Sequence, residues 1–176
     1  SNEEYKLAVE NYVIAQKLNP FEIKYEKAVK VVSQIIAQNG DINYRRQDFD
    51  LAIKNYNEAI TYYPEYTIAI FKLARTYYRQ NDLDNALITL KKGLMIDPDQ
   101  EQNEKMIGDI YRKNDNQEEA INHYKTAIKL NNNYFQAFYS LGSIYLNIGN
   151  LEEAKNALNN ALLIEPTYSK AYGTLG

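Results

Sequence analysis

Small and hydrophobic residues return along this chain at a fixed interval of 34 positions. Four alanines set the interval: Ala52, Ala86, Ala120 and Ala154. Four residues after each alanine comes a large residue: Tyr56, Leu90, Tyr124 and Leu158. Seven residues after each alanine comes a small one: Ala59, Gly93, Ala127 and Ala161. A second small position keeps the same interval, at Gly40, Ala74, Gly108, Gly142 and Gly176. Such a period is typical of stacked repeats, in which each unit packs on its neighbours.

The spacing within each period predicts two helices. In the first, large residues flank a small one on a single face, as in Leu73, Ala74 and Tyr77. The small residue permits a close crossing with the second helix, whose stripe contains the periodic alanine. We expect second helices at about 49–62, 83–96, 117–130 and 151–164. Nine complete helices, a tenth beginning near Tyr168 and no β-strand follow from this pattern.

Turn residues separate the predicted helices. Pro64, Pro98 and Pro166 keep the period, Asn132 stands in the corresponding place, and Pro20 precedes them. Proline prevents a helix from continuing. The turns inside each pair contain residue types that adopt left-handed conformations or cap the next helix: Asn81-Asp82, Asp115-Asn116 and Gly149-Asn150.

These positions resemble the tetratricopeptide repeat (TPR), and the match is nearly complete in Phe138, Leu141, Gly142, Tyr145, Ala154, Leu158, Ala161 and Pro166. The resemblance implies an all-α, right-handed superhelical solenoid of antiparallel helix pairs. Its repeats would be 33–66, 67–100, 101–134 and 135–168, with a partial repeat and helical insertion at 1–32 and the start of a truncated repeat at 169–176. Both ends look cut from a longer array.

The N-terminal region departs from this register. Residues 21–32 are extra, and they contain neither Gly nor Pro. We expect them to extend the next helix backwards by roughly 18 Å, at 1.5 Å per residue. Asn39 and Asn43 replace the Leu and Tyr of the family pattern. Either these amides pair together or face water, or the helix breaks at Asn39-Gly40, because Asn-Gly favours a turn.

Composition gives little support for catalysis. The chain has 176 residues, a net charge of −3, no cysteine and one histidine, His123. Without a partnered base, a thiolate or a spaced ligand set, we expect no enzymatic activity, no metal site and no cofactor. No apolar run reaches the roughly 20 residues of a membrane span. The acidic balance gives no reason to expect nucleic acid or an anionic membrane, and the compartment stays open between cytoplasm and bacterial periplasm.

The first helices offer a candidate binding surface. In TPR arrays the face of the first helix that the core does not use lines a concave groove, and here it would carry basic and aromatic residues together: Tyr44, Arg45, Phe71, Arg75, Tyr78, Arg79, Lys105, Arg112, Lys113 and Tyr139, with Ala37 and Asp41 beside them. Arginine and lysine would bond carboxylates while the aromatic rings cover an apolar anchor.

Two known uses of the family do not fit these positions. Repeats that bind the carboxyl terminus of heat-shock chaperones need Lys and Asn, then Asn, then Lys and Arg. The two possible frames instead hold Ala37, Asp41, Lys72, Gln102 and Met106, or Phe71, Arg75, Met106, Gln136 and Ser140. The asparagine ladder of O-linked N-acetylglucosamine transferase is also absent, since its places hold Gln38, Lys72, Met106 and Ser140.

We therefore predict a non-enzymatic scaffold that binds an extended or helical peptide with acidic and apolar residues. Two alternatives stay open. The chain could be a self-association module that uses its long N-terminal helix, or the recruiting arm of an enzyme whose catalytic domain lies elsewhere.

Overall fold

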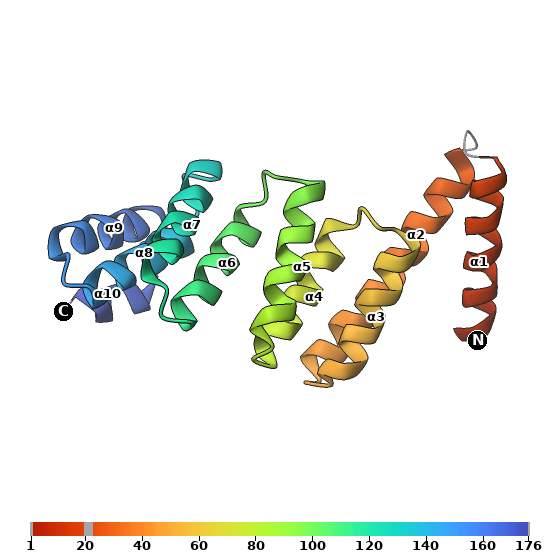
Figure 1. The fold of residues 1–176 in the computed structure, drawn as a ribbon, viewed down its shortest axis with the longest axis horizontal. Helices are drawn as coiled ribbons and strands as arrows, with labels where there is room; N and C mark the ends of the chain where they lie inside the picture. Colours follow the sequence, from red (N-terminus) through yellow and green to blue (C-terminus); the bar gives the residue numbers. More distant parts are fainter. Residues whose placement is uncertain (1, 20–22, 176) are drawn as a thin grey trace. The chain divides into compact units, whose positions relative to one another are not determined.

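A computed structural model describes residues 2–19 and 23–175 of the chain, and it is helical throughout (Figure 1). No strand occurs in these two ranges. The helices are α1 (Asn2–Leu18), α2 (Ile23–Arg45), α3 (Phe49–Tyr62), α4 (Thr67–Arg79), α5 (Leu83–Ile96), α6 (Glu101–Lys113), α7 (Gln117–Leu130), α8 (Phe135–Asn147), α9 (Leu151–Ile164) and α10 (Ser169–Leu175). The four predicted second helices, α3, α5, α7 and α9, begin and end where the sequence placed them.

The helices form two compact units, residues 1–89 and 90–176, with the boundary inside α5. In the first unit α2 pairs with α3, α4 packs on α3, and α1 packs on α2. In the second unit α6 pairs with α7 and α8 with α9, while α7 also contacts α8 and α10 contacts α9. Each unit is thus built from helical hairpins joined by short turns.

Glycine permits the close crossing of the paired helices. A Cβ atom added to Gly40 of α2 would lie 2.6 Å from Cε1 of Tyr56 in α3, and one added to Gly108 of α6 would lie 2.6 Å from Cε1 of Tyr124 in α7. Both tyrosines are fully buried. The periodic alanines, Ala52, Ala86, Ala120 and Ala154, are buried as well. The prediction that these small positions lie in the core is confirmed.

The turns between paired helices follow the 34-residue period. The backbone takes a positive φ at Gln47, Asn81, Asp115 and Gly149. The side chain of the next residue caps the following helix in three of the hairpins, where Asp48, Asp82 and Asn116 accept hydrogen bonds from the backbone N–H groups of Leu51, Asn85 and Glu119. These caps satisfy donors that a helix N-terminus leaves unpaired. The predicted turn chemistry is confirmed, whereas Pro20 lies outside the described residues.

The extension of α2 is also confirmed, because this helix of 23 residues begins at Ile23, ten positions before Ser33. The alternative of a break at Asn39-Gly40 is wrong, since α2 runs through both residues without interruption. Glycine is needed at position 40 for packing, because the Tyr56 ring lies so close that it leaves no room for a Cβ atom. Asn39 is exposed and Asn43 half-buried, so neither amide is placed deep in the core. No described helix is long and apolar enough to cross a membrane.

Candidate functional site

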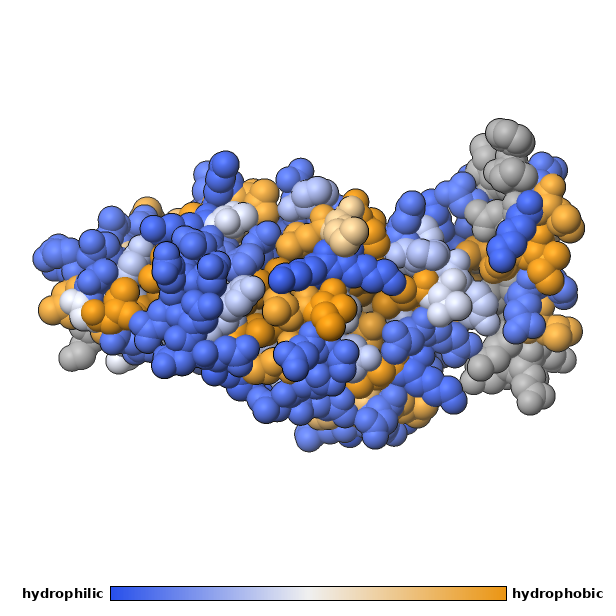
Figure 2. All heavy atoms as spheres, viewed as in Figure 1, coloured by the Kyte–Doolittle hydropathy of each residue, from blue (hydrophilic) through white to orange (hydrophobic). Residues whose placement is uncertain are grey.

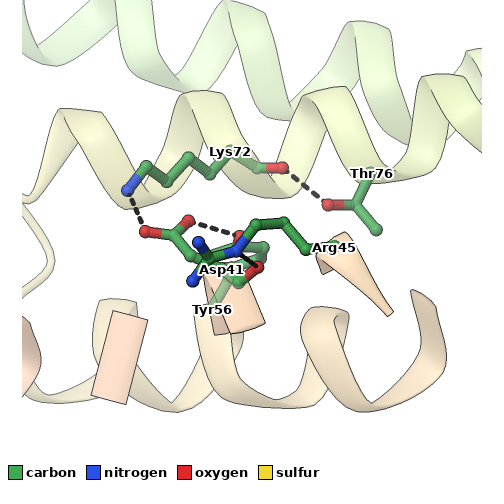
Figure 3. A network of polar contacts seen from close by, with 5 residues as sticks. All are labelled: Asp41, Arg45, Tyr56, Lys72 and Thr76. Atoms are coloured by element: carbon green, nitrogen blue, oxygen red, sulfur yellow. Dashed lines mark hydrogen bonds and ion pairs between the residues drawn. The ribbon is translucent and has the colours of Figure 1, made fainter. Parts of the chain in front are cut away.

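A single carboxylate joins three helices in the first unit. Asp41 of α2 accepts a hydrogen bond of 2.8 Å from the Tyr56 hydroxyl of α3 at Oδ1 and an ion pair of 2.6 Å from Lys72 of α4 at Oδ2 (Figure 3). The backbone carbonyl of Lys72 in turn accepts a hydrogen bond from Thr76. Asp41 therefore connects its own helix, α2, to α3 through Tyr56 and to α4 through Lys72.

Next to this carboxylate, a guanidinium stacks on an aromatic ring. Cζ of Arg75 lies 4.6 Å from the centre of the Tyr44 ring, which also contacts the edge of Phe49. Nε of Arg75 is buried and has no hydrogen-bond partner in the described part of the chain. Arg45 is exposed at the end of α2 and reaches back to the backbone carbonyl of Asp41 (Figure 3). We call Asp41, Tyr44, Arg45, Lys72 and Arg75 the first-unit cluster.

Burial determines the protonation of Tyr56 at this cluster. It raises the pKa of the Tyr56 phenol well above the ordinary value, and the hydrogen bond to Asp41 raises the pKa further. The hydroxyl therefore stays protonated near neutral pH and acts as a donor to Asp41. A group that holds its proton so firmly is a poor general base.

The second unit repeats the acid and the tyrosine two periods later in sequence, at Asp109 and Tyr124. The Tyr124 hydroxyl donates to Oδ1 of Asp109 at 2.9 Å, and Lys105 pairs with Oδ2 at 2.7 Å. Burial again raises the pKa of the tyrosine. The lysine, however, comes from the same helix as the aspartate, α6. The second cluster therefore lacks the bridge that Lys72 makes between two first helices.

The remaining predicted site residues fall into two groups. Phe71, Tyr78 and Tyr139 are half-buried, whereas Arg79, Arg112 and Lys113 are exposed. Tyr139 packs against the edge of Tyr168, with ring centres 5.1 Å apart. Hydrogen bonding with Thr174, and to a smaller extent with Ser143, lowers the pKa of Tyr139.

Two expectations about this surface need correction. Ala37 does not line a groove, because it is 1% exposed and belongs to the core around Tyr56. Arg75 does not simply project into solvent, because its Nε is buried and its guanidinium lies on Tyr44. Lys72 was not among the residues predicted for this surface, although it forms an ion pair with Asp41, 31 residues earlier in the sequence. The Lys105–Asp109 pair at i and i+4 could have been found from its spacing alone.

The one histidine has a packing role. Nδ1 of His123 lies 2.6 Å from Oε2 of Glu104, and its ring stacks on Tyr111 at 5.3 Å. The imidazole thereby connects α7 to Glu104 of α6. The described residues contain no group of three or more His, Cys, Asp or Glu side chains that could hold a metal ion.

Comparison with known proteins identifies the class of protein. Three models of tetratricopeptide repeats match residues 44–104, 108–149 and 135–168. Among solved structures, two of MamA are similar. The first is 29% identical, with a TM-score of 0.68, and the match covers 77% of this chain and 80% of that one. The second is 28% identical, with a TM-score of 0.70, and the match covers 81% of this chain and 78% of that one. The first TPR of Spaghetti (RPAP3), bound to the HSP90 peptide SRMEEVD, is 24% identical over 62% of this chain and 86% of that one, with a TM-score of 0.59.

The helical hairpins with a 34-residue period thus define a helix-repeat protein. The chain belongs to the tetratricopeptide repeat family. Members of this family are generally non-catalytic modules for protein interaction, and the chain is accordingly a protein-interaction scaffold. Among curated protein sequences, none matches it significantly.

Proposed function

We propose that this scaffold binds an extended peptide that carries carboxylates and at least one apolar side chain. The observation that carries the proposal is the stacking of Arg75 on Tyr44. A guanidinium held over a ring is pre-ordered, so less rotational freedom is lost when it bonds a carboxylate. The half-buried Phe71 lies one helical turn before Arg75 on α4 and offers apolar contact for an anchor.

The charge of the first-unit cluster supports an acidic ligand. Lys72 is neutralised by Asp41, whereas Arg45 and Arg75 leave two positive charges there, and the exposed Arg79 adds a third one turn further along α4. In the second unit, Arg112 and Lys113 are exposed beside the neutralised Lys105. The Spaghetti domain supports a peptide as the kind of partner, but only its fold is shared, and the residues of the chaperone-binding pattern are not found here.

Anisotropy of a labelled peptide tests this proposal. The probe is a short fluorescein-labelled peptide with several glutamates around one phenylalanine, and its counterpart has glutamine in place of each glutamate. The Arg75→Lys variant keeps the charge but loses the planar fork, so we expect its affinity for the glutamate peptide to fall about tenfold. Arg79→Glu is expected to weaken binding at least as much, because it reverses the charge.

Lys54→Glu is the matched control for Arg79→Glu. Lys54 is exposed on α3, so its reversal changes the net charge equally without altering the face of α4. If both variants lose the same affinity for the glutamate peptide, the effect of Arg79→Glu is explained by general electrostatic attraction alone. Equal affinity for the glutamate and glutamine peptides, or no binding of either one, would contradict the proposal.

A second candidate function, self-association, is favoured by exposed hydrophobic residues on α1. Leu7, Ile14 and Leu18 are 64%, 55% and 82% exposed, and their spacing places them on one side of the helix. Figure 2 shows hydrophobic residues at the surface over α1. Sedimentation over a range of concentrations tests this function: an Ile14→Asp variant should shift a self-associating chain towards monomer. A wild-type protein that is monomeric at every concentration would exclude it.

A further inference from the structure

The extension of α2 creates a pocket in the first unit, and its lining includes none of the residues of the first-unit cluster. This pocket has a volume of about 290 Å³ and is lined by Glu26, Val29 and Lys30 of α2 and by residues 62–65 at the turn between α3 and α4. All three α2 residues precede Ser33, where the regular repeat register begins. A repeat without the extra residues 21–32 would therefore have no such pocket.

The lining residues already bind one positive charge. Nζ of Lys30 lies 2.5 Å from Oε1 of Glu26 and 5.2 Å from the centre of the Tyr63 ring. Tyr63 is itself held in place, because its ring stacks on Tyr66 at 5.9 Å. A carboxylate beside an aromatic face is the combination that stabilises an ammonium or guanidinium group. In agreement with this, the pKa of Lys30 is raised, mainly by its hydrogen bond to Glu26.

The remaining charges favour a cation over an anion as the ligand. Glu26 and Glu65 line the pocket with Lys30 as the one basic residue, so the lining carries two negative charges against one positive charge. Lys30 is paired with Glu26, so an incoming carboxylate would have to displace Glu26 from it. Glu65 would repel an anion as well. The whole chain, with a net charge of −3, adds to this preference.

The size of the pocket limits the ligand to a single side chain. Its volume of about 290 Å³ lies just below the roughly 300–1,000 Å³ that is usual for small-molecule sites. Val29 is buried and supplies an apolar floor, and Pro64 adds apolar surface at the turn. An arginine or lysine side chain has an apolar stem that fits such a floor, and a charged end for the carboxylates and the ring.

We propose that this pocket binds an arginine or lysine side chain of a basic peptide segment, and that the ligand's cation replaces Lys30 on the Tyr63 ring. Lys30 is thus an internal competitor of the ligand. Its removal vacates the aromatic face and leaves Glu26 without its partner. The proposal adds a basic-peptide site to the scaffold and does not depend on the acidic-peptide surface at Arg75.

Binding of a labelled arginine peptide tests this site. The probe is a short fluorescein-labelled peptide with one arginine between glycine and serine residues, and its counterpart has citrulline, which keeps the shape of arginine without the charge. We expect the arginine peptide to bind more tightly than the citrulline peptide. Glu26→Gln should weaken its binding about tenfold, and Tyr63→Leu about threefold, from the loss of a charged hydrogen bond and of a cation–π contact.

The decisive comparison is Lys30→Ala with Lys27→Ala. Both variants remove one positive charge from the same turn of α2, and both lysines act on Glu26, but only Lys30 lines the pocket. The proposal predicts that Lys30→Ala binds the arginine peptide about threefold or more tightly than Lys27→Ala does. Equal affinities would overturn it, because they would reflect net charge alone.

Two further results would also overturn the proposal: equal binding of the arginine and citrulline peptides, and unchanged binding in Glu26→Gln when circular dichroism shows an intact fold. The glutamate peptide serves as the control ligand. Its affinity should be the same in Tyr63→Leu and wild type, so failure of the basic-peptide site and failure of the acidic-peptide surface are seen separately.

Discussion

Replacing Gly108 by alanine tests how closely the paired helices cross. In an isolated helix this change is favourable by about 1 kcal/mol, because alanine loses less backbone entropy than glycine. Here the added Cβ would lie 2.6 Å from Cε1 and 2.7 Å from Cδ1 of Tyr124, and 3.2 Å from the backbone oxygen of Ala120. The steric term therefore opposes the helical preference.

The magnitude follows from what has to move. The Tyr124 ring is fully buried, and its hydroxyl is bonded to Asp109. The ring cannot swing into solvent without losing this hydrogen bond, worth about 1 kcal/mol, and separating the helices instead costs about 1–3 kcal/mol of packing. After subtracting the helical gain, we expect Gly108→Ala to lower the free energy of unfolding by about 1–3 kcal/mol.

A double-mutant cycle measured by urea unfolding checks the cause. One period earlier in the sequence, the two positions hold Ala74 and Leu90, so Tyr124→Leu combined with Gly108→Ala gives both positions the residue types found there. The cost of Gly108→Ala should become smaller in the Tyr124→Leu background without vanishing, because a Cβ added to Gly142 still lies 2.7 Å from Cγ of Leu158 at the equivalent crossing. Gly173→Ala is the control without a clash, because a Cβ there meets nothing within 4 Å. An equal cost of Gly108→Ala in both backgrounds would refute the reasoning.

Three further predictions concern stability. Ala120→Leu should cost about 1–3 kcal/mol by overpacking the same crossing, and an unchanged thermal midpoint would show that the register is misjudged. Asn103 is 1% exposed, its Oδ1 has no partner among the described residues, its Nδ2 donates only a long hydrogen bond of 3.4 Å to the carbonyl of Leu90, and alanine stands one period before and after it, at Ala69 and Ala137. Asn103→Ala should therefore raise the free energy of unfolding by about 1 kcal/mol, and a comparable drop would contradict this. Because burial raises the pKa of Tyr56 and Tyr124, only the unfolded chain ionises them above about pH 10. Stability should fall there by up to about 1.4 kcal/mol per pH unit for each tyrosine, and less steeply in Tyr→Phe variants. Equal slopes would exclude these residues as the cause.

The helices could be predicted from the sequence because each depends on neighbours a few positions away. The 34-residue period, the small residues at the crossings and the left-handed turn residues are local features, and they placed α3, α5, α7 and α9 correctly. Gly40 shows the limit of a local rule. Asn-Gly favours a turn in isolation, yet the buried Tyr56 ring makes the same glycine a packing residue inside α2.

The candidate sites were only partly predictable, since their contacts join residues that are distant in sequence. The types and positions of Tyr44, Arg75 and Lys105 indicated a basic and aromatic surface. The pairing of Lys72 with Asp41 and the stacking of Arg75 on Tyr44 could not be foreseen, because they depend on how α2 and α4 pack and on which rotamer each long side chain adopts. The pocket around Lys30 has the same origin, as it exists only where the extended α2 meets the turn after α3.

By itself, the sequence determined the class of fold, the core positions and the extended helix, because repeated local patterns specify them one period at a time. Only the tertiary structure decided which charges are neutralised, which rings are covered and where a pocket forms. Charge pairing and side-chain burial depend on distances between helices, and those distances are set by the packing of whole hairpins.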